Sequence, residues 1–290
     1  MAAAPPSTHP MSTPNAGLSN SDFARLRELI YAESGINLNA EKKTMLEIRL
    51  KRRLQSLSAS SIAEYCDYVF EPGGKESELV HLIDAVTTNK TDFFREADHF
   101  DYLASTALPE LAARRRAGRK CLVWSAGCST GEEPYTLAMV LSEYAETCPG
   151  FRFSLLATDI CTAVLSKARM GIYKSELVRP VPQGLRRKYL MRSRDPESDL
   201  HRVVPELRDL IEFRRLNFMD ADFGLPEPPE IIFCRNVIIY FDRATQVRVL
   251  QRLTAQMAAG GYFFAGHSES LQNMDLPLAP VATAVYRKSR

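Results

Sequence analysis

Residues 121–135 read CLVWSAGCSTGEEPY, which is a short apolar run followed by a turn of small residues and two adjacent glutamates. The apolar run predicts a buried strand, and the small residues predict a tight turn that opens a helix near Glu133. In open α/β sheets, ligands bind where such turns follow the carboxyl ends of the strands. This stretch therefore indicates an α/β domain whose ligand site includes residues 125–135.

The glycine spacing and the two glutamates restrict the class of ligand. Gly127 and Gly131 are four residues apart, so the GxGxxG pattern of dinucleotide-binding folds is absent. Glu132 and Glu133 lie where a pyrophosphate would need helix N–H groups and no negative charge. The turn therefore favours a ligand with cationic groups, such as the sulfonium and α-amino groups of S-adenosylmethionine, over NAD or ATP. A tight turn before a charged helix start, without a ligand, is the alternative that this loop alone leaves open.

Four more apolar runs downstream predict strands that alternate with helices, and this order indicates a mostly parallel sheet. The runs lie at 153–157, 211–216, 231–234 and 261–265, and the intervening helices are expected to begin near Glu133, Thr162 and Thr245. Residues 173–210 do not fit the alternation, because they are rich in Pro, Arg and Asp and too long for a simple loop. They predict a small inserted subdomain.

The second predicted strand is followed by a carboxylate, Asp159, 28 residues beyond Gly131. At the end of a strand, a carboxylate can accept both hydroxyl groups of a ribose. By itself Asp159 could equally cap the helix that follows Cys161. The two features at consecutive strand ends support each other, because each predicts a different part of one adenosyl ligand.

The first ninety residues predict an all-helical unit after a short tail. The tail, residues 1–17, is small, polar and interrupted by prolines, so we expect it to be disordered. Ser21 is expected to cap a first helix that stops at Gly35, a second helix follows at 39–57, and Ser61 with Glu64 forms a capping box for a third. A fourth amphipathic segment ends near Val86. We therefore expect a helical domain at 18–86 and a catalytic domain at 87–290.

Composition and charge exclude several classes of protein. With 45% hydrophobic and 25% charged residues, the chain has the composition of an ordinary globular protein. A formal net charge of +2 is too small for a nucleic-acid binder that works through its overall charge. The six cysteines form no CxxC pair, so neither a zinc site nor a disulfide framework is indicated. With no signal-like or membrane-spanning run, we expect a cytoplasmic monomer without a metal ion and without membrane insertion.

Four motifs resemble those of the CheR family, the chemotaxis receptor methyltransferases that use S-adenosylmethionine to methylate protein glutamates. They read TTNKTDFFRE at 87–96, SAGCSTGEEPY at 125–135, IFCRNVIIYF at 232–241 and FAGHSE at 264–269. Together with the helical unit, the resemblance covers about residues 20–287. It implies a Rossmann-like α/β methyltransferase sheet with a small inserted β-subdomain, preceded by an all-α N-terminal domain.

The resemblance also implies roles for individual residues. The positions that match cofactor-binding residues of the family are Asn89, Thr91, Arg95, Glu133, Asp159, Asn217, Phe218, Arg235 and Asn236. Among them, Glu133 is expected to face the cofactor's amino group, Asp159 its ribose and Asn217 with Phe218 its adenine.

The resemblance assigns Arg95 and Tyr240 to catalysis, with Tyr240 beside the transferred methyl group. Thr91 and Arg95 are expected on one helical face, where they would bind a carboxylate such as the methionine tail. Two ordinary alternatives remain open: the phenylalanines Phe93, Phe94 and Phe218 can be core residues, and Arg95 can be a simple ion-pair partner.

The expected reaction needs little acid–base chemistry. A glutamate side chain is ionised at neutral pH and is already a nucleophile, so no base is required. We therefore assign no catalytic histidine, and we interpret His267 as a satisfied polar residue at a strand end. The sequence Gly266–Ser270 superficially resembles the GxSxG motif of serine hydrolases, but its fifth residue is Ser270 instead of glycine, which excludes that class.

The second predicted helix carries the local charge and indicates a partner. Residues 39–57 contain six basic and two acidic residues, and Lys42, Arg49, Arg52 and Arg53 share one face. In the family, this helix is thought to recognise the glutamate-rich cytoplasmic helices of chemoreceptors, which would make these four residues the substrate-binding set. A solvated charged face is the alternative, and the absence of interleaved aromatic residues argues against nucleic acid.

The inserted subdomain suggests a second contact with the same partner. It aligns with the family's β-subdomain, which in some members binds the C-terminal peptide of a receptor. The sequence MRSRDPESD at 191–199 departs from the glycine-rich loop found there.

We expect methyl transfer to receptor glutamates, with S-adenosylhomocysteine as the second product. A cofactor-sensing scaffold without transfer, and methylation of a small molecule or nucleic acid, are the alternatives.

Overall fold

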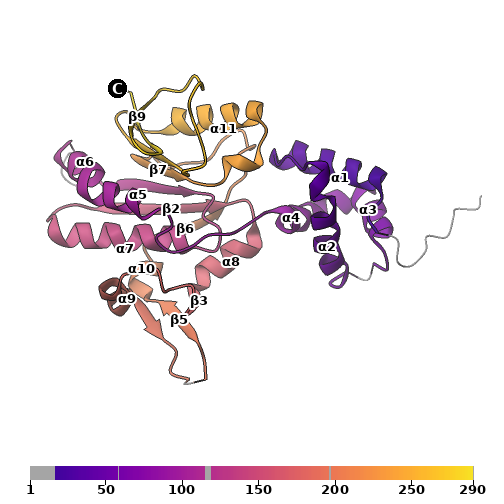
Figure 1. Ribbon diagram of the computed structural model, residues 1–290, viewed down its shortest axis with the longest axis horizontal. Helices are drawn as coiled ribbons and strands as arrows, with labels where there is room; N and C mark the ends of the chain where they lie inside the picture. The colour runs from indigo at the N-terminus through magenta and orange to yellow at the C-terminus, as the bar shows by residue number, and fades with distance from the viewer. Residues whose placement is uncertain (1–16, 58, 115–118, 196, 290) are drawn as a thin grey trace, which may run out of the picture. The chain divides into compact units, whose positions relative to one another are not determined.

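The computed structural model describes residues 17–57, 59–114, 119–195 and 197–289 (Figure 1). The chain divides into two compact units, Met1–Thr87 and Thr88–Arg290. The tail expected to be disordered, residues 1–17, lies outside the described residues except for Gly17. Among the described residues, no helix has the length and apolar character that crossing a membrane requires.

The first unit consists of helices, as the hydrophobic periodicity predicts. They are α1 (Asn20–Ser34), the 3₁₀ turn η1 (Ala40–Lys42), α2 (Lys43–Leu54), α3 (Ile62–Phe70) and α4 (Gly74–Val86). The prediction that Ser21 caps α1 is wrong. Ser19 caps it, because Ser19 has an extended backbone and its hydroxyl accepts the Asp22 N–H. The predicted stop at Gly35 is confirmed by its left-handed backbone, with φ 73°.

A buried ion pair joins α2 to α4 inside this unit. Glu78 is only 2% exposed, and its two carboxylate oxygens accept hydrogen bonds from Arg53 Nε at 2.6 Å and Nη2 at 3.0 Å. The hydroxyl of Tyr65 on α3 donates to the same carboxylate at 3.3 Å. Glu78 also raises the pKa of Arg53 through this hydrogen bond. Three helices therefore meet at one carboxylate.

The second unit is built on a seven-stranded sheet in the order β6-β2-β1-β7-β8-β10-β9. Its strands are β1 (Cys121–Ala126), β2 (Phe153–Asp159), β6 (Ile211–Arg215), β7 (Ile231–Cys234), β8 (Tyr262–Ala265), β9 (Leu278–Ala282) and β10 (Val285–Lys288). The first five are parallel, and β10 and β9 pair antiparallel at one edge. The predicted α/β class with a mostly parallel sheet is confirmed.

Helices cover both faces of this sheet. They are α5 (Ala97–Tyr102), the π-helical turn η2 (Leu103–Ala107), α6 (Leu108–Arg114), α7 (Glu132–Thr147), α8 (Thr162–Met170) and α11 (Arg243–Gln256). Residues of α5, η2, α6 and α7 share one buried apolar cluster with Val123, Leu155 and Phe233 of the strands. Figure 1 shows α11 on the opposite side of the sheet from α7.

The strand order places a ligand site at the carboxyl ends of β1 and β7. The chain passes from β1 to β2 on one side and returns to pair β7 on the other side of β1, so the connections diverge between these two strands. At such a switch point the loops separate and leave a crevice. The loops concerned begin at Gly127 and Arg235.

The predicted insert forms a small subdomain with its own sheet. It contains β3 (Ile172–Lys174), α9 (Gln183–Tyr189), β4 (Leu190–Arg192), β5 (Leu200–Val203) and α10 (Pro205–Arg208), with strand order β3-β5-β4. Lys188 of α9 binds Glu143 of α7 at 2.7 Å, and the Tyr189 hydroxyl donates to the same carboxylate. These contacts attach the subdomain to α7.

His99 fastens α5 to the sheet as a neutral side chain. Its Nδ1 lies 3.2 Å from Arg235 Nη1 and its Nε2 lies 3.3 Å from the Thr283 carbonyl oxygen. Because the guanidinium only donates, Nδ1 accepts and the Nε2–H donates to Thr283. Burial and the neighbouring Arg235 charge lower the pKa of His99 to about 4.

We predict that Glu78→Ala destabilises the helical unit by about 3 kcal/mol, because it leaves Arg53 without its buried counter-charge. Urea denaturation followed by circular dichroism measures the free energy of unfolding. Glu76→Ala, an exposed position on the same helix, is the matched control and should cost less than about 0.5 kcal/mol. Equal unfolding midpoints for the two variants would contradict the role of the pair.

We predict a loss of stability on mild acidification that depends on His99. The folded pKa of about 4 lies below the ordinary value of 6.5, so the unfolded chain binds more protons between these values and stability falls as the pH drops. Between pH 7 and pH 5.5, the wild type should lose about 1 kcal/mol more than His99→Gln, which cannot titrate there. The measurement is urea denaturation at both pH values, and equal losses in the two proteins would refute it.

Candidate functional site

The turn after β1 has a backbone that only glycine adopts easily at two positions. Gly127 and Gly131 have φ values of 95° and 101°. A Cβ at Gly127 would lie 2.4 Å from Val237 Cγ2, and one at Gly131 would lie 2.8 Å from the Tyr173 hydroxyl. The small residues of the turn therefore allow the loops after β1 and β7, and the inserted subdomain, to approach each other closely.

Asp159 connects the ends of β1 and β2. Its Oδ2 accepts the Ser129 N–H at 2.8 Å and its Oδ1 accepts the Cys161 N–H at 2.9 Å. The N-cap residue of α8 is Cys161, so Asp159 joins the residue before this helix to the β1 turn and is not itself the cap. These two bonds fix the Asp159 carboxylate between the turn after β1 and the residue before α8.

Glu133 and Arg235 form a buried ion pair at the centre of this edge. Arg235 Nε donates to Glu133 Oε2 at 2.7 Å, and the Ser125 hydroxyl donates to Oε1 at 2.7 Å. Arg235 Nη1 donates to the Arg95 carbonyl at 2.7 Å. The sequence analysis assigned Glu133 and Arg235 to the site but did not predict that they form an ion pair.

The neighbouring Glu132 is also buried, and it adds to the acidic character of the turn. Its carboxylate accepts a hydrogen bond from the Thr130 hydroxyl at 2.6 Å. Burial raises the pKa of Glu132, whereas this hydrogen bond opposes the shift. Two buried carboxyl groups therefore follow the β1 turn, and each has a partner in the protein: Glu133 pairs with Arg235, and Glu132 accepts the Thr130 hydroxyl.

The segment before α5 lies along the same edge. The Asn89 carbonyl accepts the Ser129 hydroxyl at 2.8 Å, and the Phe94 N–H donates to the Thr136 hydroxyl at 3.2 Å. This segment brings Asn89 and Arg95 to the turns after β1 and β7. The structure thus gathers residues that are far apart in the sequence.

The prediction that Thr91 and Arg95 share a helical face is wrong. Residues 87–92 form no helix, and Phe94 and Glu96 have left-handed backbones with φ values of 54° and 57°. Left-handed residues interrupt a right-handed helix, so α5 begins only at Ala97. Arg95 is half-buried, and its Nη1 donates to the Lys90 carbonyl at 3.2 Å.

The residues expected near adenine and the methyl group follow β6 and β7. Asn217 organises a turn in which its Oδ1 accepts the Met219 N–H at 3.0 Å. Phe218 is buried, and its ring packs edge-on against Phe223 at 6.2 Å. Phe218 is therefore a core residue in this structure. Tyr240 ends the 3₁₀ turn η3 (Ile238–Tyr240) and is half-buried.

Sequence reasoning missed the role of Glu269 within the motif at 264–269. Its buried carboxylate accepts backbone N–H groups from the loops after β7 and β8, including that of Asn236 at 2.7 Å and that of Gly266 at 2.7 Å. The signal available in the sequence was an acidic residue following a predicted buried strand. His267, which shares the motif, forms an exposed pair with Asp98 at 3.0 Å, in line with its interpretation as a satisfied polar residue.

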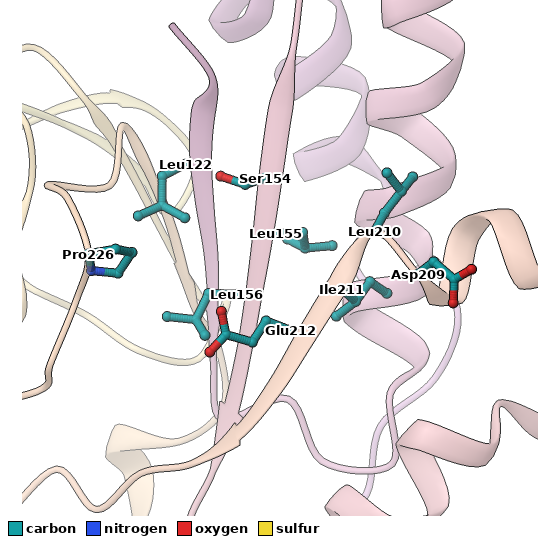
Figure 2. A pocket seen from close by; sticks show the side chains of 9 residues that line it. All are labelled: Leu122, Ser154, Leu155, Leu156, Asp209, Leu210, Ile211, Glu212 and Pro226. Carbon is teal, nitrogen blue, oxygen red and sulfur yellow. The ribbon is translucent and has the colours of Figure 1, made fainter.

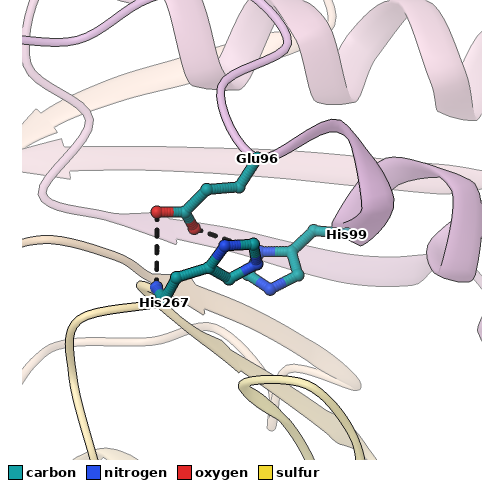
Figure 3. Close-up of side chains that lie close together, drawn as sticks. All are labelled: Glu96, His99 and His267. Atoms are coloured by element: carbon teal, nitrogen blue, oxygen red, sulfur yellow. Dashed lines mark hydrogen bonds and ion pairs between the residues drawn. The ribbon is translucent and has the colours of Figure 1, made fainter.

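Three potential metal ligands meet next to this edge but do not suit a cation. Glu96, His99 and His267 place ligand atoms within 4.8 Å of one another (Figure 3). Arg235 Nη1 lies 3.4 Å from the Glu96 carboxylate and 3.2 Å from His99 Nδ1. A positive charge therefore already lies beside two of these three ligands, Glu96 and His99.

The four basic residues predicted to bind substrate have two different environments. Arg53 binds Glu78, and Arg49 Nη1 donates to the carbonyls of Ala85 and Thr87 at 3.1 and 2.7 Å. Lys42 and Arg52 are exposed. Arg49 and Arg53 thus hold the helical unit together, and Lys42 and Arg52 present charge to solvent.

A hollow on the surface of the second unit lies apart from all of these residues. It is found near the amino-terminal ends of β1, β2 and β6, and its lining includes no predicted site residue (Figure 2). The lining residues are Leu122, Ser154, Leu155, Leu156, Asp209, Leu210, Ile211, Glu212 and Pro226. The candidate site is therefore the carboxyl edge and not this hollow.

Comparisons with known proteins match both units of the chain. Residues 89–286 match the family model described as CheR methyltransferase, SAM binding domain, and residues 21–87 match CheR methyltransferase, all-alpha domain. The chain is 42% identical to the chemotaxis protein methyltransferase of Escherichia coli K12 over 279 residues, which cover 96% of this chain and 94% of that protein.

Two further relatives match over similar lengths. Chemotaxis protein methyltransferase 2 of Pseudomonas aeruginosa is 40% identical, over 96% of this chain and 99% of that protein. The chemotaxis protein methyltransferase of Borreliella burgdorferi is 36% identical, over 95% and 96%. Both domains and nearly the full length are thus matched, and the chain belongs to the CheR family of S-adenosylmethionine-dependent methyltransferases.

Proposed function

We propose that this enzyme transfers methyl groups from S-adenosylmethionine to glutamate side chains on the cytoplasmic helices of chemoreceptors. The observation that carries the proposal is the grouping of Asn89, Arg95, Glu133 and Asp159 around the glycine turn at the switch point of the sheet. The relatives that match nearly the whole chain are named chemotaxis protein methyltransferases. Because the proposed substrate helices are cytoplasmic, we propose that the enzyme acts there, as a monomer.

The residues at this edge fit the proposed cofactor. We assign Asp159, at the carboxyl end of β2, to the ribose, and the turn has no side chain at Gly127 and Gly131. Arg95 supplies a guanidinium for a carboxylate, with Asn89 and Thr91 on the same segment. We assign Asn217 and Phe218 to the adenine side, and Arg235 with Asn236 to the turn that closes the site. S-adenosylmethionine supplies a methyl group that its sulfonium activates for transfer.

In the proposed reaction, the residues of this chain bind and orient the cofactor and the substrate glutamate. A substrate glutamate is ionised at neutral pH, so no side chain has to remove a proton. We assign to Tyr240 a place beside the transferred methyl group. Glu133, Asp159 and Arg235 are buried, and we assign to these surroundings the exclusion of water from the reacting groups, which would strengthen electrostatic contacts there. The reaction requires no metal ion.

The helical unit supplies a surface for an acidic partner. Lys42 and Arg52 are exposed, so they can meet glutamate-rich helices at little desolvation cost. Arg49 and Arg53 stabilise the helices that carry this surface, because both bind residues of α4 inside the unit. Nucleic acid is not the proposed substrate.

The inserted subdomain is a candidate site for a receptor's C-terminal peptide. In the strand order β3-β5-β4, the described parts of β3 and β4 each have only one neighbour in the sheet. An extended peptide can add to such an edge through backbone hydrogen bonds.

The direct test is incubation of the full chain with radiolabelled S-adenosylmethionine and a receptor cytoplasmic fragment. We expect base-labile methyl esters on glutamate, because the proposed product is a carboxylate ester. Arg95→Ala should abolish transfer and leave the fold intact, since Arg95 is half-buried and makes one hydrogen bond to a backbone carbonyl.

Three outcomes would reject parts of this proposal. Label on a small molecule or on nucleic acid would change the substrate class. Tight cofactor binding without transfer to any receptor of the host would favour a sensing scaffold. Near-wild-type turnover in Arg95→Ala would remove Arg95 from the site.

We predict that combining Lys42→Glu with Arg52→Glu lowers kcat/KM for the receptor fragment about ten-fold at low salt, with a smaller effect at high salt. Affinity for S-adenosylhomocysteine, measured by calorimetry, should stay unchanged, because both residues belong to the helical unit. A matched control combines Arg27→Glu with Lys75→Glu, two exposed positions on α1 and α4. Equal losses in both double variants would show that overall charge, not this surface, selects the substrate.

A further inference from the structure

Glu269 is a buried carboxylate that none of the proposed steps uses. It follows β8 and is 4% exposed. It belongs to the motif at 264–269, in which the other polar side chains, His267 and Ser268, are exposed. A buried carboxylate is costly unless strong partners compensate its charge, so its partners show what it does.

Four backbone N–H groups from two loops donate to this carboxylate. Oε2 accepts from Asn236 at 2.7 Å and from Gly266 at 2.7 Å. Oε1 accepts from Val237 at 2.8 Å and from Ile238 at 3.0 Å. Three consecutive N–H groups that converge on one anion form a backbone nest, so Glu269 fills an anion site inside the protein.

The nest requires an unusual backbone at its first residue. Asn236 has a φ of 58°, in the left-handed region, which turns the following N–H groups toward Glu269. Without the carboxylate, these N–H groups would lose their acceptor, which is unfavourable because those of Ile238 and Gly266 are buried. The carboxylate and the turn therefore depend on each other.

The turn at residues 236–238 is also closely packed on two sides. A Cβ at Gly266 would lie 2.5 Å from Asn236 Nδ2 and 2.9 Å from Glu269 Oε2. On its other side, Val237 Cγ2 lies where a Cβ of Gly127 would clash, at 2.4 Å. A shift of the turn would therefore disturb the glycine turn after β1 as well.

The turn joins two parts of the candidate site. Arg235, which binds Glu133, immediately precedes it, and Tyr240 lies at the end of η3, which follows it. We propose that Glu269 is a positioning residue for methyl transfer, which holds the segment from Asn236 to Tyr240 against the cofactor edge. This inference rests on the proposed function, because that function gives the segment its role.

An amide cannot replace the carboxylate in this position. All four contacts need an acceptor, and a glutamine offers one acceptor oxygen and one NH₂ group. In Glu269→Gln, two of the four N–H groups would therefore face another donor. The variant keeps the size of the side chain and changes only this pattern of donors and acceptors.

The test compares Glu269→Gln with Glu230→Gln in the full chain. Glu230 is a matched control, because its Oε2 accepts the Leu122 N–H at 2.9 Å at the amino-terminal end of β1, the opposite edge of the sheet. Calorimetry gives the affinity for S-adenosylhomocysteine, methyl transfer to the receptor fragment gives kcat and KM, and thermal melting reports folding. All assays run well below the melting temperature of each variant.

We expect Glu269→Gln to weaken S-adenosylhomocysteine binding at least ten-fold and to lower kcat at saturating cofactor. We expect Glu230→Gln to stay within two-fold of wild type in both, even if it melts at a similarly reduced temperature. Cofactor affinity and kcat within two-fold of wild type for Glu269→Gln would overturn the proposal, because a merely stabilising carboxylate would behave in that way.

A second variant and a second readout keep the result decisive. If Glu269→Gln does not fold, Gly266→Ala displaces the turn with the carboxylate intact, and it should cause the same loss of affinity. Unchanged affinity in folded Gly266→Ala would overturn the inference. If the wild type binds S-adenosylhomocysteine but methylates no receptor fragment, the proposed substrate fails, whereas the affinities still decide the role of Glu269.

Discussion

The buried ion pair between Arg235 and Glu133 is the interaction on which the cofactor edge depends. It joins the end of β7 to the first turn of α7 at 2.7 Å, and a further bond from Arg235 to the Arg95 carbonyl adds the segment before α5. Neither charge can be left alone in this environment, because an unpaired buried charge costs several kcal/mol. The positions of the three segments therefore depend on one another, because a shift of one would break a bond that Arg235 makes to another. The guanidinium also excludes a second cation from the space between Glu96 and His99.

Two other carboxylates shape the same edge by accepting backbone N–H groups. Asp159 receives those of Ser129 and Cys161, and Glu269 receives those of the loops after β7 and β8. Charge-assisted bonds of this kind are among the strongest that a loop can form. They explain why irregular loops can hold a fixed shape beside a ligand site, with small residues where the loops approach each other.

In the helical unit, some basic residues of η1 and α2 stabilise the fold and others lie at the surface. Arg53 compensates the buried Glu78, and Arg49 binds carbonyls at the end of α4. The excess positive charge of this region is therefore smaller at the surface than in the sequence. The exposed part, at Lys42 and Arg52, is the part that can meet an acidic partner.

The sequence by itself determined the α/β class, the position of the five parallel strands and the glycine turn after the first of them, because buried strands are continuous apolar runs and the turn has a distinctive composition. It missed the β9–β10 hairpin, whose first strand is largely exposed and contains Pro280, and it predicted a helix where Phe94 and Glu96 turn left-handed. Only the tertiary structure decided which partners these residues have, such as Arg235 with Glu133, 102 positions apart. The physical reason is that ion pairs and hydrogen bonds act over about 3 Å, a distance that the fold sets and the spacing along the chain does not.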